Sequence, residues 1–151
     1  MHTTSNNGAA RYAPGTVSGG LAAPADLAQA QKSVASNRVM VLDPKDPSRA
    51  LEASTAQAVY AAAGTLPVTV VAYGDASSQF LLVLHRGSSG ARLGQPVLMP
   101  SSQAGFEYRG SYSIAGLPLT DPRAGSYTLT VTWTESNGET LIADLPVTIT
   151  P

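Results

Sequence analysis

The chain has 151 residues, of which 43% are hydrophobic and only 13% are charged, with nine basic and ten acidic side chains. This length suits one domain with an extension, and the near-neutral charge excludes the basic footprint of a nucleic-acid-binding protein and the polybasic patch of a membrane anchor. The absence of cysteine excludes disulfides, zinc–thiolate sites and cysteine nucleophiles. No stretch approaches the ~20 apolar residues of a membrane-spanning helix, so we expect neither nucleic acid nor a membrane as partner.

The N-terminal segment is predicted to be an extended arm. Residues 1–24 are rich in Gly, Ser, Thr, Asn and Ala without regular apolar spacing, a composition that buries too little surface to order by itself. Such a segment is either a disordered tail or an arm that orders on a neighbouring subunit. Residues 24–36 favour a short helix after Pro24. The anchors of a partner-binding arm would be Tyr12, Pro14, Leu21 and Leu27.

The beginning of the chain also bears on export. The first eleven residues show no basic start followed by an apolar run, so a secretory signal is not expected. This expectation is one of the features that motivate the hypothesis of a protein assembled in the host cytoplasm.

The segment after the arm is predicted to be extended. Residues 38–42 indicate a strand, and the Asp-Pro pairs of residues 43–48 indicate a turn, because proline keeps its predecessor out of the helical region. Residues 49–63 leave two alternatives, a helix capped by Gly64 or edge strands that include residues 58–60. We favour the extended alternative.

From Thr65 onward the pattern becomes that of β-strands. Leu66, Val68, Val70 and Ala72 alternate with other residues, and the nearly continuous apolar run at 80–84 is typical of a central, buried strand. The glycine-rich residues 86–94 predict a flexible loop. Residues 96–100 are bracketed by prolines, which predicts a short strand at a sheet edge.

The last third of the chain repeats the alternation three times. Residues 106–114 place Phe106, Tyr108, Gly110, Tyr112 and Ile114 on one parity, with Gly110 marking a β-bulge. Ser136-Asn137-Gly138-Glu139 predicts a hairpin with a type I′ turn. The inward residues of the strands on either side of this hairpin are Tyr127, Leu129, Val131 and Trp133, then Leu145, Val147 and Ile149.

Several short strands separated by turn chemistry predict an antiparallel β-sandwich or barrel rather than βαβ units. The fold class is therefore mainly β, with an extended N-terminal arm. The predicted organisation is an arm with a possible short helix over residues 1–37, a connecting segment with edge strands over 38–64, and a sandwich over 65–151.

The sequence at residues 117–133 resembles the E–F corner of immunoglobulin-like domains. Asp121, Gly125 and Tyr127 take the positions of the D…G-x-Y pattern, and the second cysteine of antibody domains is replaced by Leu129. The resemblance implies that the Tyr127 hydroxyl bonds to upstream backbone. The strand-C tryptophan of antibodies is missing, so Phe80 or Leu82 would fill its place. The resemblance is thus to Ig-like modules of bacterial and bacteriophage proteins, and it covers roughly residues 65–151.

Candidate chemistry is sparse. His85 ends an apolar strand next to Arg86, but a catalytic histidine needs a nucleophile and an orienting carboxylate, so we interpret it as a surface or rim residue.

Asp43 and Asp46 could offer oxygens to Ca²⁺ but lie in ordinary Asp-Pro turns without an EF-hand-like loop. We interpret Glu135 and Glu139, beside the Asn-Gly turn, as solvated. The Gly87–Gly94 segment lacks the Lys-Ser/Thr ending of a phosphate loop. No catalytic, cofactor or metal residue is therefore predicted.

Three functions remain as hypotheses. The first is a non-enzymatic virion structural protein, such as a capsid decoration or accessory protein. It would assemble in the host cytoplasm, bind the major capsid protein or other virion subunits through its arm, and act in many copies or as a homo-oligomer. The alternative is a secreted or cell-surface adhesion or carbohydrate-binding module, which would be extracellular. A small hydrolase is the least favoured, since no acid–base constellation is visible.

Overall fold

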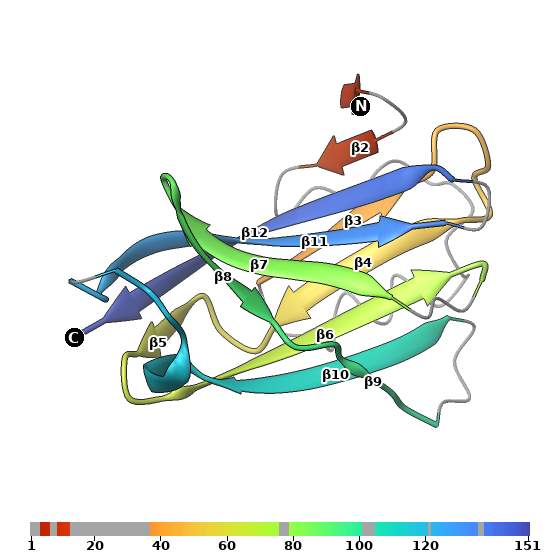
Figure 1. The fold of residues 1–151 in the computed structure, drawn as a ribbon. Helices are drawn as coiled ribbons and strands as arrows, with labels where there is room; N and C mark the ends of the chain where they lie inside the picture. Colours follow the sequence, from red (N-terminus) through yellow and green to blue (C-terminus); the bar gives the residue numbers. More distant parts are fainter. Residues whose placement is uncertain are drawn as a thin grey trace.

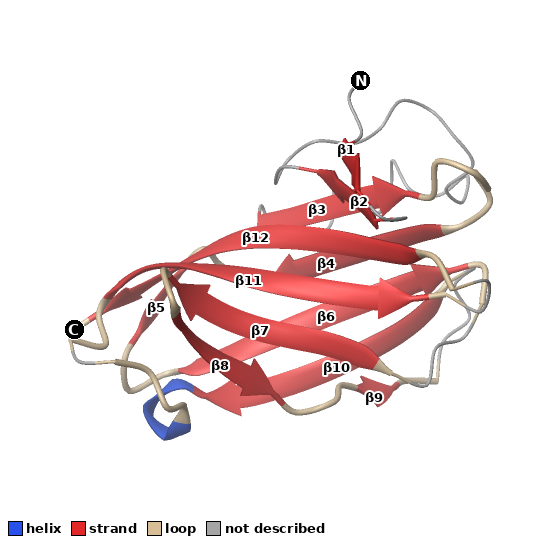
Figure 2. Ribbon diagram, turned by 45° about the horizontal axis from the view of Figure 1, so that its top comes forward, coloured by secondary structure: helices blue, strands red, loops and turns tan. Residues whose placement is uncertain are grey.

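The computed structural model describes residues 4–6, 9–12, 37–75, 79–100, 105–120, 122–135 and 138–151. Two β-sheets lie face to face, and the described residues add one 3₁₀ turn at Ile114–Gly116 (Figures 1 and 2). The seven-stranded sheet has the order β1 (Thr4–Asn6), β2 (Ala9–Tyr12), β12 (Thr140–Thr150), β11 (Gly125–Thr134), β7 (Phe80–Arg86) and β8 (Ser89–Leu93), with β5 (Val59–Ala61) also paired to β12. The five-stranded sheet has the order β3 (Asn37–Leu42), β4 (Ala50–Thr55), β6 (Thr65–Tyr73), β10 (Phe106–Ser113) and β9 (Val97–Leu98).

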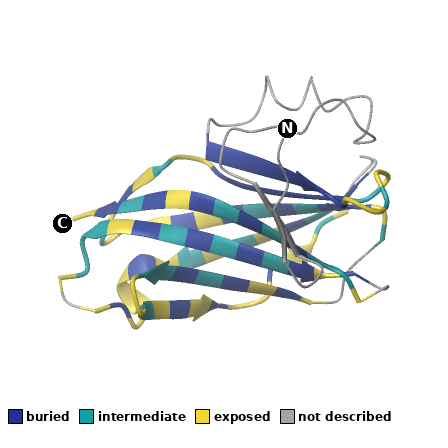
Figure 3. Cartoon of the chain, turned by 90° about the horizontal axis from the view of Figure 1, so that it is seen from above, coloured by how far each residue is buried: buried dark blue, intermediate teal, exposed yellow. Residues whose placement is uncertain are grey.

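The mainly-β prediction is confirmed, and its cause is the period-2 spacing of apolar residues. Alternate side chains of β6, β7, β11 and β12 point between the sheets, and Figure 3 shows the strands banded by burial. Tyr127 is 3% exposed and Trp133 is 1% exposed. Phe80 packs edge-on against Tyr108, with ring centroids 4.8 Å apart. The core therefore lies between the sheets, lined by residues from Val39 to Ile149.

Residues 49–63, for which the sequence left a helix and edge strands as alternatives, contain the two strands β4 and β5, as we favoured. β4 pairs antiparallel with β3 and β6, and β5 pairs in parallel with β12. The turn predicted at 43–48 is also present between β3 and β4. These strands contribute Leu51 and Tyr60 to the same core as the C-terminal strands.

Both faces of β3 and β4 are buried, which alternation alone does not predict. Their outward residues form a second apolar cluster with Tyr73, composed of Met40, Leu42 and Ala50. Beside it lies a buried ion pair between Arg38 and Glu52, and burial lowers the pKa of Arg38.

Three local expectations are wrong. Residues 86–94 are not a flexible loop: β8 pairs along β7 through a tight turn in which Gly87 has φ +60°. β7 is central, but Leu81 on its outer face is 39% exposed, so the run is half-buried. Gly110 is not a bulge, because β10 pairs with β6 without interruption; its missing side chain leaves room for the Tyr112 ring.

Two smaller differences concern strand ends. Phe106 has the inward parity but is 38% exposed, because it begins β10 at the rim of the sheet. The β11–β12 hairpin is present, but its turn is shifted by one residue: Gly138 N–H donates to Glu135 O at 2.9 Å, and Gly138 has φ +85°. This is the pattern of a three-residue loop closed by a glycine bulge rather than a two-residue type I′ turn.

One end of the sandwich is held by bonds to backbone carbonyls. The Tyr127 hydroxyl donates to Arg123 O at 2.6 Å, which confirms the predicted upstream bond. Arg123 Nη1 donates to Ile114 O and Leu117 O at 3.1 and 2.5 Å. Arg86 donates to Ala124 O and Pro122 O, both at 2.7 Å, and its guanidinium lies 4.7 Å from the centre of the Tyr127 ring. We call this group the carbonyl-bonded corner.

Several predicted features lie outside the described residues. These are the helix at 24–36, the anchors Pro14, Leu21 and Leu27, and Asp121 of the corner pattern. Tyr12 ends β2, and its side chain is likewise not described.

Candidate functional site

A shallow hollow of about 670 Å³ lies on the outer face of the seven-stranded sheet. Four neighbouring elements form it: β7, the β7–β8 turn with β8, β11 and β12. The residues that line it are Val83, His85, Gly87, Ser88, Ser89, Gly90, Thr128, Thr130 and Asp144. Its volume falls in the range of small-molecule sites, but it is open rather than enclosed.

A chain of hydrogen bonds crosses the floor of this hollow. Thr130 Oγ1 donates to Asp144 Oδ1 at 2.7 Å and lies 2.8 Å from His85 Nε2. Because the single hydroxyl proton is directed to the carboxylate, the hydroxyl must accept from the histidine, which places a proton on Nε2. The strand register explains the encounter, since Thr130 lies opposite Asp144 of β12 and two residues along β11 from Thr128, the partner of His85.

The order of these groups decides what they can do. In a hydrolytic triad the histidine stands between the hydroxyl and the carboxylate and accepts the hydroxyl proton. Here the threonine stands in the middle and the histidine donates, so His85 does not activate Thr130 as a nucleophile. The arrangement instead offers fixed donors and acceptors to a polar, hydroxyl-bearing ligand.

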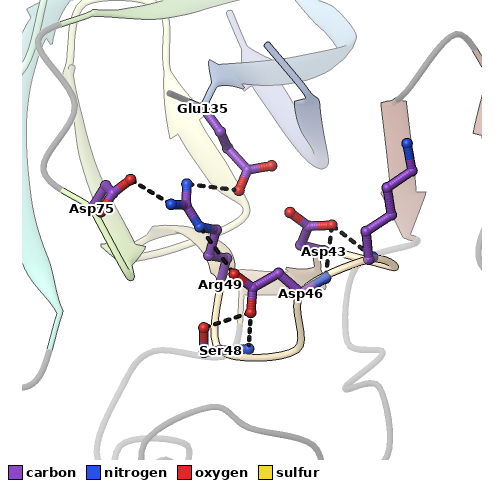
Figure 4. Close-up of polar contacts among 7 residues, drawn as sticks. Asp43, Asp46, Ser48, Arg49, Asp75 and Glu135 are labelled. Carbon is purple, nitrogen blue, oxygen red and sulfur yellow. Dashed lines mark hydrogen bonds and ion pairs between the residues drawn. The ribbon is translucent and has the colours of Figure 1, made fainter. Parts of the chain in front are cut away.

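A second polar cluster lies where the β3–β4 loop meets the β11–β12 hairpin (Figure 4). Arg49 stands at its centre, with Nη2 2.6 Å from Asp75, Nε 3.3 Å from Asp46 and Nη1 3.5 Å from Glu135. Lys45 Nζ lies 2.6 Å from Glu139. We call this group, with Asp43, the carboxylate end.

The carboxyl groups of this end differ in environment. Burial raises the pKa of Glu135 to about 8, assisted by the neighbouring Asp43 carboxyl group and opposed by Arg49. The pKa of Asp46 is instead lowered, chiefly because the Ser48 hydroxyl donates to it at 2.6 Å. The prediction that Glu135 and Glu139 are solvated is wrong, since Glu135 is 3% exposed and the Glu139 side chain is 15% exposed with Oε2 buried.

The Ca²⁺ alternative for Asp43 and Asp46 receives no support. Asp43 Oδ1 accepts from the backbone N–H groups of Lys45 and Asp46 at 2.8 and 3.3 Å, while the Asp46 oxygens bond to Ser48 and Arg49. Among the residues that the structure describes, no group of three or more His, Cys, Asp or Glu is placed to hold a metal ion.

Exposed apolar residues gather at one sheet edge. Val97 is 65% exposed and Leu98 is 50% exposed in β9, the edge strand that the flanking prolines predicted, and Phe106 lies on the adjoining strand β10. Sequence reasoning found this edge but missed both polar clusters, because each is assembled by pairing between strands distant in the chain. For these clusters the sequence offers one signal, the polar or charged type of each residue, and that type does not indicate which residues come together.

No protein-family model, curated protein or solved structure matches the chain. In the described part of the chain, no helix has the length and apolar character needed to cross a membrane.

Proposed function

We propose that this chain is a non-enzymatic structural subunit with an Ig-like body, an accessory protein of a multi-copy particle such as a bacteriophage capsid. The body is the β-sandwich, which presents its outer faces on the particle. The N-terminal arm, with Tyr12, Pro14, Leu21 and Leu27, is the part that attaches to the major capsid protein or another virion subunit.

The observation that carries the Ig-like part of this proposal is the strand order. The path β4-β6-β10-β9 follows the A-B-E-D order of one Ig sheet, and β12-β11-β7-β8 follows the G-F-C-C′ order of the other. β5, between the first two of these strands in the chain, crosses to pair with β12. The bond from Tyr127 to the Arg123 carbonyl stands at the E–F corner of this scheme.

A different observation supports attachment through the N-terminal segment. β2 adds to the edge of the seven-stranded sheet by parallel pairing with β12, from Thr140 opposite Ala9 to Ala143 opposite Tyr12. Backbone pairing at a sheet edge needs little sequence-specific surface, and it is a common way for an extended segment to join a partner. An arm that pairs in this manner suits attachment to a neighbouring subunit.

The test is co-sedimentation with particles. Virions purified by density gradient from cultures that carry the gene should contain the chain at a fixed copy number per capsid protein, measured by quantitative mass spectrometry. The full-length protein added to particles that lack it should bind, and a variant with Tyr12, Leu21 and Leu27 changed to alanine should not. Absence of the chain from purified particles, or equal binding by the variant, would refute the proposal.

A second candidate is an adhesion or carbohydrate-binding module, and the hollow at His85 is the observation that favours it. Fixed donors and acceptors from His85, Thr130 and Asp144 suit the hydroxyl groups of a sugar. Binding on a glycan array that is lost on Asp144→Asn, while Arg92→Ala on the neighbouring strand retains it, would support this function. The absence of glycan binding by the wild-type protein would refute this second function.

A further inference from the structure

The carboxyl groups of Asp43 and Glu135 form a buried pair at the carboxylate end. Asp43 is 2% exposed and Glu135 is 3% exposed, and Figure 4 shows both carboxyl groups directed into the same space beside Arg49. Asp43 Oδ1 is occupied by the backbone of its own turn. The other oxygen, Oδ2, and Oε2 of Glu135 are buried, and no described residue donates a hydrogen bond to either.

Two ionised carboxylates have acceptors only, so they cannot bond to each other. A single proton between them supplies the missing donor and removes one buried negative charge. Repulsion from the Asp43 carboxylate is one cause of the raised pKa of Glu135, which agrees with a proton held between the two groups.

The charged side chains that the structure describes around Asp43 and Glu135 do not neutralise the pair when both groups are ionised. Arg49 is divided among three carboxylates, and Lys45 is engaged by Glu139. Among the described side chains at this end, five carboxylates face two cations, which leaves three excess negative charges when all are ionised and two when the pair holds a proton. The groups are Asp43, Lys45, Asp46 and Arg49 of the β3–β4 loop, Asp75 after β6, and Glu135 and Glu139 of the hairpin.

We propose that Asp43 and Glu135 are a proton-operated latch: their shared proton joins the β3–β4 loop of one sheet to the β11–β12 hairpin of the other, and its loss in mildly alkaline solution separates them. The latch is independent of the proposed function, because it concerns the body alone. Its consequence is a sandwich whose end opens as pH rises.

The sign of the effect follows from linkage. The pKa of Glu135 is raised from 4.5 to about 8 in the folded chain, so the folded state holds this proton more tightly than the unfolded state. Stability from the pair is therefore complete below about pH 4.5, declines as pH rises, and is lost above about pH 8.

The experiment compares the melting temperature of the full chain and two variants from pH 5 to pH 9. Glu135→Gln replaces the protonated acid by an amide that donates to Asp43 at every pH. Glu139→Gln is the matched control on the same hairpin, because Glu139 faces Lys45. Any contribution of His85 is common to all three proteins and cancels in the difference.

We expect the wild type and Glu139→Gln to lose several degrees between pH 6 and pH 9, and Glu135→Gln to lose much less. Asp43→Asn, whose amide can donate to an ionised Glu135, should also flatten the profile, which keeps the test valid if Glu135→Gln folds poorly. A wild-type decline that is unchanged in both Glu135→Gln and Asp43→Asn would overturn the latch. So would added CaCl₂ that raises the wild-type melting temperature but not that of Glu135→Gln, since the pair would then hold a divalent cation rather than a proton.

Discussion

The two ends of β11 are fastened by arginines that bind different acceptors. At the carbonyl-bonded corner, Arg86 and Arg123 donate to neutral backbone oxygens beside Tyr127. At the carboxylate end, Arg49 contacts three carboxylates beside a buried acid pair. A carbonyl accepts a hydrogen bond at any pH, whereas a carboxyl group changes charge. One sandwich therefore has one end that is indifferent to pH and one that responds to it.

The largest expected effect comes from the core that both ends share. Trp133→Ala removes a side chain that is 1% exposed, and we expect it to cost about 3–5 kcal/mol of unfolding free energy. Urea denaturation followed by circular dichroism measures this. Leu81→Ala, on the outer face of the adjoining strand, should cost far less; equal losses would mean that Trp133 does not fill the core.

The next effect tests the carbonyl-bonded corner. Arg86→Ala leaves Ala124 O and Pro122 O without their donor and uncovers the Tyr127 ring, so we expect a loss of about 2 kcal/mol. The loss should be the same at pH 6 and pH 9. Arg92→Ala, exposed on β8, is the control and should leave the denaturation midpoint unchanged. A pH-dependent loss for Arg86→Ala would remove the contrast between the two ends.

A smaller change isolates one bond of the corner. Tyr127→Phe removes only the hydroxyl that bonds to Arg123 O, which should cost about 1 kcal/mol. Tyr112→Phe removes an exposed hydroxyl that bonds to Gly94 O and should cost less. If Tyr127→Phe leaves the unfolding free energy unchanged in the same urea titration, the corner does not depend on this bond.

The smallest effect is expected at the rim of the carboxylate end. Lys45 reaches Glu139 from solvent, with 71% of the lysine side chain and 15% of the glutamate side chain exposed, so water screens the ammonium group. Lys45→Met should leave the melting temperature at pH 7 within experimental error, as measured by scanning fluorimetry. A drop as large as that of Arg86→Ala would show that charge at this end matters more than its exposure implies.

The sequence predicts best the features that depend on local periodicity. Alternation placed Tyr127, Trp133 and Ile149 inward, and the prolines around β9 marked an edge strand. The sequence prediction is wrong at residues 86–94, where we take the glycines as a sign of a flexible loop although they allow a tight β7–β8 hairpin. A turn glycine and a loop glycine look alike until the pairing of the flanking strands is known.

The polar clusters were beyond prediction for a different reason. Thr130 resembled any outward threonine, and Asp43 any turn aspartate. Their roles depend on cross-strand neighbours, His85 and Asp144 in one case and Glu135 in the other, which no local pattern specifies. Burial of Glu135 at a hairpin end runs against the usual solvation of charged turn residues.

Native-state hydrogen exchange of the full chain at pH 6 and pH 9, corrected for the intrinsic pH dependence of exchange, tests the contrast between the ends most directly. At pH 9 we expect the bonded amides of Asp43, Arg49, Glu135 and Gly138 to lose protection, while those of Ile114 and Leu117 beside the carbonyl-bonded corner keep it. Equal loss at both ends, or no loss at either, would contradict the account.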